Sequence, residues 1–348
     1  MILEKLTIAV TGLNAIDSPG PGVAVIRALK EAKSFDVRII GLCYDTLEPG
    51  IYMHDIIDRT YQIPYPSEGT APLTERLEYI HSKEKLNVII PNFDAELYSF
   101  MKLEKLLKQM GIHMFLPTLE QFEERHKANL SKFGIKYDIK VPLSKTISSA
   151  NDFNELKPDM DFPFMVKGKW YDAYIAYNME QANNYFNKIT AKWGLPVIAQ
   201  EFVHGTEYNL IGLGDGLGGL AAAVPMRKQY ITDKGKAWGG ISIDDKKLIG
   251  IARRFVAQTK WKGGFELEMI RDQENNYYLV EINPRIPAWV YLAVGAGQNI
   301  PEILVQLAMG YDIQPLTEYK VGKMFVRYSW DMIVDREEFE AISMNGEL

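Results

Sequence analysis

The chain has 348 residues, a formal net charge of −6 and one cysteine. This length favours two or three domains, and the acidic balance argues against a nucleic-acid partner or an anionic membrane surface. The single cysteine excludes an internal disulfide framework and predicts a cytoplasmic protein. No apolar run approaches the roughly 18 residues of a transmembrane helix, and the opening residues are typical of a first strand and not of a signal peptide.

The first 115 residues alternate apolar strands with helices, which indicates a doubly wound, largely parallel α/β sheet. The expected strands are 6–10, 37–43, 88–91 and 112–116, and the expected helices are 22–33, 74–83 and 95–109. Ligands in such sheets bind beyond the carboxyl ends of the strands. The residues expected at that edge are Thr11, Gly12, Asn14, Asp45, Asn92, Asp94 and Glu96.

A glycine-containing turn follows the first expected strand. Three glycines between residues 12 and 22, with Asp45 as a ribose-binding acid, suggest a dinucleotide-binding loop. The turn is too long for that fingerprint, and Pro21 stands between its last two glycines, so nicotinamide binding is disfavoured. A loop that needs a positive φ and a loop that helps to hold a second substrate remain equal alternatives.

Two lysines in the middle of the chain are candidates for contacts with phosphate. The charged segment 119–133 predicts a single helix, and Lys127 lies on it, although most lysines on such a helix are only solvated. The run 161–168 predicts a short apolar strand that ends at Lys167 and a glycine. A cation at the end of a rigid strand suits an anionic ligand, and an ordinary surface lysine is the competing interpretation.

A strand, a sharp turn at Gly205 and a second strand are expected between residues 195 and 212. Such a turn exposes backbone N–H and C=O groups from Glu201 to Val203, which suits the recognition of a purine edge. Glu207 would then accept hydrogen bonds from ribose hydroxyl groups. The pattern by itself is weak evidence, since many hairpins contain glutamate and glycine.

The segment 212–219 is the most glycine-dense part of the chain. It lacks the Gly-Lys-Ser/Thr ending of a phosphate-binding Walker motif, and it lies between two apolar strands, so it predicts a tight hairpin turn. The basic segment from 226 to 240 then predicts a mobile loop over a polyphosphate.

The most informative stretch runs from Gly264 to Arg285. Two runs that alternate apolar and acidic residues flank a polar turn at 273–276, which predicts a β-hairpin with a four-residue loop. With that loop, Asp272 faces Tyr277. Counting inward places four polar residues on one face of the hairpin, because side chains alternate faces along a strand. The two opposing pairs are Glu268 with Glu281 and Glu266 with Asn283.

These four polar side chains call for a bound cation. Like charges that face each other destabilise a sheet, and oxygen ligands suit Mg²⁺ or Mn²⁺. Arg285, two residues beyond Asn283, would extend from the same face towards a phosphate. An amphipathic hairpin with a merely solvated acidic face is the competing interpretation, and the Asn-Pro-Arg ending disfavours it.

In this order the segments resemble the ATP-grasp superfamily, in particular the branch of the carbamoyl-phosphate synthase large chain and stand-alone carboxylate–amine ligases. The most specific element is Glu281-Ile-Asn283-Pro-Arg285, with Glu268 upstream of it. The resemblance covers nearly the whole chain and implies four segments. They are an N-terminal pre-ATP-grasp α/β domain (1–115), a lid subdomain (116–195), a C-terminal ATP-grasp subdomain (196–315) and a C-terminal extension (316–348).

The resemblance implies an ATP-dependent ligase that activates a carboxylate as an acyl phosphate and couples it to an amine, with an amino acid or a small peptide as substrate. It implies Mg²⁺ or Mn²⁺ bound by Glu268, Glu281 and Asn283, with Arg285 as the catalytic residue at the transferring phosphate and Glu266 as a neighbour. It assigns ATP to Lys127 and Lys167 at the phosphates, Glu201 and Val203 at the adenine and Glu207 at the ribose.

One departure from the family pattern concerns the loop after Lys167. Family members usually carry a longer glycine-rich loop there, whereas residues 167–174 are few and aromatic. Either Trp170 and Tyr171 form another lid, or closure comes mainly from the region 227–240. A non-catalytic ATP-binding scaffold that works with a partner protein is therefore the alternative function. A homodimer is the oligomeric state that the resemblance suggests.

Overall fold

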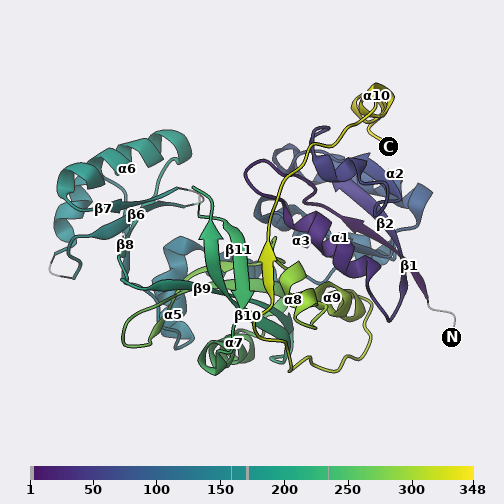
Figure 1. Cartoon of the computed structure of the whole chain (residues 1–348). Coiled ribbons are helices and arrows are strands. Elements are labelled where there is room, and N and C mark those ends of the chain that lie inside the picture. The colour runs from purple at the N-terminus through teal and green to yellow at the C-terminus, as the bar shows by residue number, and fades with distance from the viewer. Residues whose placement is uncertain (1–3, 158, 170–171, 234) are drawn as a thin grey trace. The chain divides into compact units, whose positions relative to one another are not determined.

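The computed structural model describes residues 4–157, 159–169, 172–233 and 235–348 (Figure 1). Contacts between residues divide the chain into two compact units. The larger unit contains residues 1–119, 209–266 and 283–348, and the smaller unit contains residues 120–208 and 267–282. Each of the four predicted segments is one continuous stretch of the chain. Each of the two observed units, by contrast, is built from two or three separate stretches.

The N-terminal part of the larger unit is the predicted parallel α/β sheet. Its strand order is β3-β2-β1-β4, and every neighbouring pair is parallel. The strands are β1 (Lys5–Val10), β2 (Asp36–Cys43), β3 (Arg59–Gln62) and β4 (Val88–Ile90), and the helices are α1 (Pro21–Lys30), α2 (Thr70–Glu84) and α3 (Asp94–Gln109). β1, β2 and β4 are mostly apolar and buried, as expected where helices cover a parallel sheet, whereas β3 has the polar sequence Arg-Thr-Tyr-Gln and was not predicted.

The strand expected at 112–116 is wrong. Only His113 joins the sheet, through a single parallel bridge to Val88, with backbone hydrogen bonds of 2.8 Å to Asn87 O and 3.0 Å from Ile89 N. Ile112, Met114 and Leu116 are nevertheless buried. Their alternation therefore reflects burial against the sheet edge, which gives the residue pattern of a strand although the segment forms a single bridge and not a strand ladder.

A second sheet has six strands in the order β13-β12-β9-β10-β11-β14. Its strands are β9 (Thr206–Asp215), β10 (Leu220–Ile231), β11 (Ala237–Ser242), β12 (Lys262–Arg271), β13 (Tyr277–Asn283) and β14 (Met324–Val326). The larger unit also contains α7 (Lys246–Thr259), α8 (Tyr291–Gly295), α9 (Ile300–Ala308) and α10 (Arg336–Asn345).

The glycine-rich segment 212–219 forms the predicted hairpin turn between β9 and β10. Asp215 Oδ1 accepts the backbone N–H groups of Leu217, Gly218 and Gly219 at 2.7, 2.9 and 2.8 Å. The N–H groups that a phosphate loop would present are thus already bonded to a carboxylate of the chain. A phosphate-binding role is excluded for this turn by its own hydrogen bonds.

The mobile loop expected at 226–240 is wrong for most of that segment. β10 continues to Ile231 and pairs with β11 in antiparallel register from Met226 opposite Ser242 to Ile231 opposite Ala237. Only residues 232–236 connect the two strands, and one of them, 234, lies outside the described residues. Basic residues on a strand give the same composition as a basic loop.

The smaller unit contains a four-stranded antiparallel sheet in the order β5-β8-β6-β7. Its strands are β5 (Ser144–Ile147), β6 (Phe164–Gly168), β7 (Ala173–Ala176) and β8 (Val197–Glu201). The helix α6 (Met179–Trp193) buries Ala182, Phe186 and Ile189 in a core shared with Phe164 and Val166. This packing fixes the strand that carries Lys167.

The single helix expected at 119–133 is wrong, because it is interrupted. The chain forms α4 (Leu119–Glu124), a 3₁₀ turn (Lys127–Asn129) and α5 (Leu130–Lys136). His126 is extended (φ −56°, ψ 141°) and buried, with its ring edge-on to Phe122 at 5.7 Å between ring centres. The extended backbone of His126 separates α4 from the 3₁₀ turn, in which Asn129 N donates to His126 O at 2.7 Å.

The turn between β12 and β13 is one residue shorter than predicted. Asp272 N donates to Asn276 O at 3.0 Å, and Asn275 N donates to Asp272 O at 3.2 Å. Asn275 is left-handed (φ 66°), which matches a three-residue hairpin loop with a bulge. Asp272 therefore faces Asn276, and the prediction that it faces Tyr277 is wrong.

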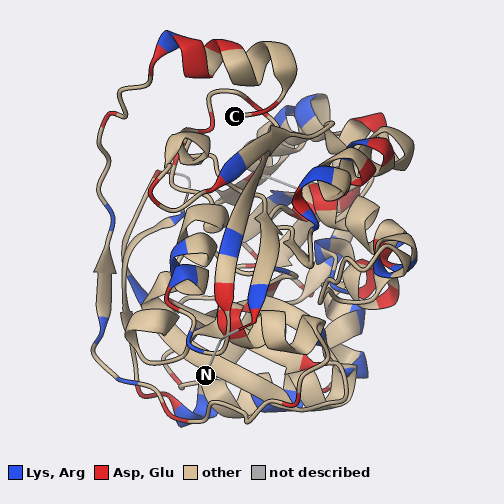
Figure 2. Cartoon of the chain, turned by 90° about the vertical axis from the view of Figure 1, so that its right-hand side faces the viewer, with Lys and Arg blue, Asp and Glu red and all other residues tan. Residues whose placement is uncertain are grey.

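The C-terminal segment returns to the N-terminal sheet (Figure 2). Backbone hydrogen bonds join Leu348 to Thr60 in both directions, at 2.7 and 2.9 Å, and Gln62 N donates to Gly346 O at 2.9 Å. The chain end thereby covers the edge strand β3. Across the described residues, the structure contains no helix with the length and apolar character needed to cross a membrane.

Candidate functional site

Lys167 lies at the end of β6, as predicted, and its ammonium group is held in place. Lys167 Nζ donates to Gln200 Oε1 at 2.6 Å, and Gln200 Nε2 donates to Ser144 Oγ at 3.0 Å. Gln200 belongs to β8, which pairs with β6, and its side chain is buried. Three strands of one sheet therefore orient this lysine.

Lys127 forms an ion pair with Glu281. The distance from Lys127 Nζ to Glu281 Oε2 is 3.1 Å, and both side chains are partly buried. The interruption of the predicted helix places Lys127 in the 3₁₀ turn that follows His126. A predicted phosphate-binding lysine and a predicted metal-binding carboxylate thus meet within the smaller unit.

Four other predicted site residues carry charges that affect the pKa of Lys167. Burial, followed by the nearby charge of Lys127, lowers the pKa of the Lys167 ammonium group to about 8. Three carboxylates act in the opposite direction, namely those of Glu281, Glu268 and Glu207. Both lysines and all three carboxylates belong to the smaller unit, so this unit gathers them around one cation.

We expect Lys167 to titrate near pH 8 in the nucleotide-free protein, whereas exposed lysines titrate at about pH 10.4. NMR of ¹³C-labelled lysine side chains measures this directly. Lys127→Gln removes a like charge and raises the pKa of Lys167, while Lys132→Gln, on the exposed surface of α5, leaves it unchanged. A Lys167 pKa at the ordinary lysine value would contradict the burial described above.

The predicted adenine hinge is partly occupied by the chain itself. Glu201 N donates to Leu143 O at 2.8 Å, and Glu201 Oε2 accepts Leu143 N at 3.1 Å. The prediction of an exposed N–H group at Glu201 is therefore wrong. Val203 is half-buried and Glu207 is exposed at the start of β9, and their nucleotide contacts stay predictions.

Gly205 follows the predicted hinge and lies against the backbone of the β12–β13 hairpin. A Cβ atom at this position would lie 2.2 Å from Arg271 O, so only glycine fits. Arg271 also donates to the hydroxyl group of Tyr208 and stacks on its ring, with Cζ 4.3 Å from the ring centre. The predicted turn at Gly205 is thus required by packing inside the smaller unit.

In the larger unit, Asn283 is held by Glu266. Asn283 Nδ2 donates to Glu266 Oε2 at 2.9 Å, which agrees with the predicted proximity of the two residues. Glu266 Oε1 accepts Asn209 Nδ2 at 2.7 Å and Trp289 Nε1 at 2.6 Å. Glu266 is only 5% exposed. It therefore orients the amide of Asn283, and the role of Asn283 as a metal ligand stays a prediction.

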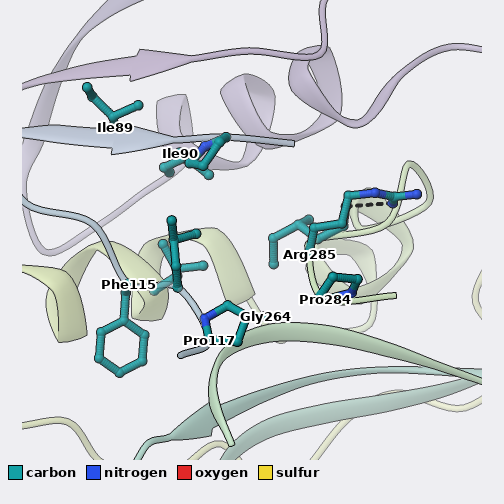
Figure 3. A pocket seen from close by; sticks show the side chains of 11 residues that line it. Ile89, Ile90, Phe115, Pro117, Gly264, Pro284 and Arg285 are labelled. Atoms are coloured by element: carbon teal, nitrogen blue, oxygen red, sulfur yellow. Dashed lines mark hydrogen bonds between the residues drawn. The ribbon is translucent and has the colours of Figure 1, made fainter. Parts of the chain in front are cut away.

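Arg285 is paired with an acid of the N-terminal sheet edge. Arg285 Nε donates to Asp94 Oδ2 at 2.7 Å. A cavity of about 10 Å³ lies beside it, with room for one water molecule at most. Ile90, Phe115 and Gly264 are among the residues that line it, and the Arg285 side chain extends away from the apolar ones (Figure 3). This cavity is too small for a nucleotide.

The predicted metal ligands are two carboxylates and one amide. Glu268 and Glu281 belong to the smaller unit and Asn283 to the larger unit. Across the residues that are described, no three Asp, Glu, His or Cys side chains form a ready-made metal cage. The oxygen-only donor set still fits Mg²⁺, which takes one or two carboxylates together with substrate phosphates.

Trp170 and Tyr171, proposed as an alternative lid, are not among the described residues.

Three partners of the site residues were not predicted. The unpredicted residues are the partners that orient the site: Gln200, Asn209 and, for Arg285, Asp94. A polar residue inside an apolar strand is the only sequence signal for Gln200 and Asn209, and their partners are distant in sequence.

Comparisons with known proteins identify the fold of this chain. The family model "ATP-grasp in the biosynthetic pathway with Ter operon" matches residues 195–328. The biotin carboxylase domain dimer of Hydrogenobacter thermophilus 2-oxoglutarate carboxylase, with MgADP, ADP and bicarbonate, superposes with a TM-score of 0.70. It is 16% identical, over 91% of this chain and 72% of that one. The chain has the ATP-grasp fold.

Two further structures share the ATP-grasp fold. N5-carboxyaminoimidazole synthetase from Staphylococcus aureus has a TM-score of 0.69 at 15% identity, over 92% of this chain and 82% of that one. Phosphoribosylglycinamide synthetase from Anaerococcus prevotii has a TM-score of 0.63 at 15% identity, over 92% and 80%. A comparison with curated proteins gave no match. The predicted branch within the ATP-grasp superfamily stays a prediction.

Proposed function

We propose that the protein is an ATP-dependent ligase that activates a carboxylate as an acyl phosphate and couples it to an amine. The observation that carries this proposal is the 3.1 Å ion pair between Lys127 and Glu281. Each of these charges neutralises the other in the nucleotide-free protein. When Mg·ATP binds, Lys127 would bind the phosphates and Glu281 would bind the metal. These two contacts with the ligand would replace the ion pair between the side chains.

In this proposal Lys127 and Lys167 bind the phosphates, Glu201 and Val203 the adenine and Glu207 the ribose. Glu268, Glu281 and Asn283 would hold Mg²⁺ (or Mn²⁺), and the bound metal neutralises the phosphate oxygens during transfer. Arg285, held by Asp94, stabilises the charge of the transferring phosphate. Most of the rate comes from positioning and charge stabilisation, as is usual for phosphoryl transfer.

The reaction has two steps. An oxygen of the substrate carboxylate attacks the γ-phosphorus, the bond between that phosphorus and the β–γ bridging oxygen breaks, and ADP leaves. The amine nitrogen then attacks the acyl carbon, the bond from that carbon to the phosphate oxygen breaks, and inorganic phosphate leaves while the nitrogen loses a proton. Exclusion of water protects the acyl phosphate between the steps.

Release of ADP by the purified full chain tests this function. With Mg·ATP and pools of small carboxylates and amino acids, we expect ADP release that EDTA abolishes and added Mg²⁺ restores. ATP binding without ADP release for any pool would instead favour a non-catalytic scaffold. Absence of ATP binding in calorimetry would contradict both functions.

The cellular setting follows from the same proposal. We propose a cytoplasmic enzyme, because ATP and amino acids are available there and the chain has a single cysteine. We also propose a homodimer, since the Hydrogenobacter domain that shares this fold is a dimer. Sedimentation of the full chain measures the oligomeric state.

A further inference from the structure

β14 is the edge strand of the six-stranded sheet. In Figure 1 its yellow arrow lies beside β11, and among the described residues no strand pairs with its other side. The opposite edge of this sheet, β13, receives a hydrogen bond from the chain, because Leu279 N donates to Lys140 O at 2.8 Å. The C-terminal residues likewise cover β3 of the N-terminal sheet. An uncovered edge strand is a ready template for pairing with another chain.

The backbone of β14 presents donors and acceptors along its open edge. Ser242 N donates to Lys323 O at 2.8 Å, so the odd-numbered residues of this segment bond β11. In an antiparallel pair the residues between them direct their N–H and C=O groups away from the partner strand. The backbone groups of Met324 and Val326 therefore point to the open edge. In the part of the chain that the structure describes, no backbone partner for them is found.

An exposed row of apolar side chains accompanies this edge. Met324, Val326, Tyr328 and Trp330 are 58, 75, 70 and 58% exposed. Their even spacing places them on one face, because side chains alternate faces along an extended chain. The rings of Tyr328 and Trp330 lie 4.8 Å apart between their centres. Exposed apolar patches mark interaction surfaces, and aromatic residues are enriched in the cores of protein interfaces.

The charges of this segment are complementary to those of a second copy. Residues 320–327 contain three cations and no acid, whereas residues 331–340 contain five acids and one cation. That cation, Arg336, is paired with Glu340 at 2.6 Å. In an antiparallel arrangement the basic part of one copy lies along the acidic part of the other, which favours the contact. A parallel arrangement would place like charges side by side.

The same charges select the register of such a pair. Like charges directly opposite each other destabilise a sheet. A pair centred on residue 325 would set Lys323 opposite the partner's Arg327, and one centred on residue 327 would set Arg327 opposite the partner's Arg327. A pair centred on Val326 avoids both clashes. Val326 then faces the partner's Val326, and Met324 faces the partner's Tyr328.

We propose that β14 pairs in antiparallel register with β14 of a second copy, centred on Val326, so that the two six-stranded sheets become one. The backbone groups of the open edge would supply affinity, and the apolar row would supply specificity. A twofold axis at Val326 relates the copies, and the pair closes because it uses the β14 edge of both chains. This inference rests on the homodimer proposed above, assigns its contact surface and is independent of ligase activity.

The test uses the self-pairing of Val326. Sedimentation equilibrium of the full chain should give about twice the 39.6 kDa of one chain for the wild type. We expect Val326→Lys and Val326→Glu each to raise the Kd of the dimer about 100-fold, because like charges then meet at the twofold axis. An equimolar mixture of the two variants should dimerise again, since opposite charges face each other. Leu217→Lys, at an exposed apolar residue of the β9–β10 turn, should behave like the wild type.

A further variant and a second readout separate the surface from the oligomeric state. Val326→Pro removes an N–H group that faces away from β11, so it should dissociate the dimer and keep the pairing with β11. Hydrogen exchange at the Val326 amide should be slow in the wild type and fast in Val326→Lys. A dimer that Val326→Lys and Val326→Pro leave intact overturns this inference but not the homodimer. A monomeric wild type overturns both, while ADP release tests the ligase function separately.

Discussion

Replacement of Glu281 by glutamine is expected to lower Mg²⁺-dependent ADP release by about 100- to 1000-fold. A loss of this size is expected when the metal ion no longer stabilises the charge on the transferring phosphate. The amide keeps the shape of the side chain but loses the negative charge that a metal needs. It also removes the partner of Lys127, which lies 3.1 Å from Glu281 in the nucleotide-free protein. The variant therefore loses its metal ligand and alters the charge of the phosphate site together.

The control for this variant comes from the same hairpin. Glu274→Gln changes an exposed glutamate of the β12–β13 turn, and we expect normal ADP release from it. Binding of Mn²⁺ in the presence of ADP, followed by electron paramagnetic resonance, reports on the metal without turnover. If Glu281→Gln released ADP at the wild-type rate with an unchanged Mg²⁺ dependence, the metal assignment would be wrong.

Replacement of Glu266 by leucine is expected to cost about 3 kcal/mol of unfolding free energy, since it strands three buried donors. Those donors belong to Asn209, Asn283 and Trp289, which are 1, 8 and 5% exposed. Their distances to the Glu266 carboxylate are 2.6–2.9 Å. ADP release should fall as well, because Asn283 loses the contact that orients its amide.

Unfolding in urea measures the cost, with two comparisons. Glu266→Gln keeps one oxygen acceptor and should lose less stability than Glu266→Leu. Glu318→Gln, at an exposed position of the same unit, should change the unfolding free energy by less than about 0.5 kcal/mol. Equal stability of Glu266→Leu and the wild type would show that these donors find other partners.

The fold class could be predicted because its signals are local. The strands β1, β2 and β4 carry apolar runs that polar turns separate from the helices, so the alternation is visible in the sequence, whereas the polar β3 (Arg59–Gln62) was not predicted. The failures arose where the backbone departs from what the apolar pattern alone predicts. At His126 an extended backbone interrupts a segment whose residue types are those of a continuous helix. The segment at 112–116 buries its side chains without forming a strand ladder.

For the candidate site, too, the sequence predicted some residues and missed others. The hairpin pattern singled out Glu268 and Glu281, and the family resemblance assigned Lys127 and Lys167 to the phosphates. In the structure Lys127 pairs with Glu281 at 3.1 Å, and the charges of Lys127, Glu281 and Glu268 affect the pKa of Lys167. The partners that hold the site were not predicted. Gln200 and Glu266 act through hydrogen bonds to residues that are far away in sequence, and no short-range pattern encodes such contacts.

By itself, the sequence predicted the alternating α/β pattern of the N-terminal sheet and the β-hairpin that carries Glu281-Ile-Asn283-Pro-Arg285, and its resemblance to the ATP-grasp superfamily predicted the fold. Periodicity suffices for the alternating pattern and the hairpin, because each depends on neighbours along the chain, whereas the fold assignment came from the family resemblance. Only the tertiary structure decided that Glu281 pairs with Lys127 and that the predicted neighbour Glu266 orients Asn283. These features depend on burial and on strand pairing between distant segments, which a local pattern does not contain.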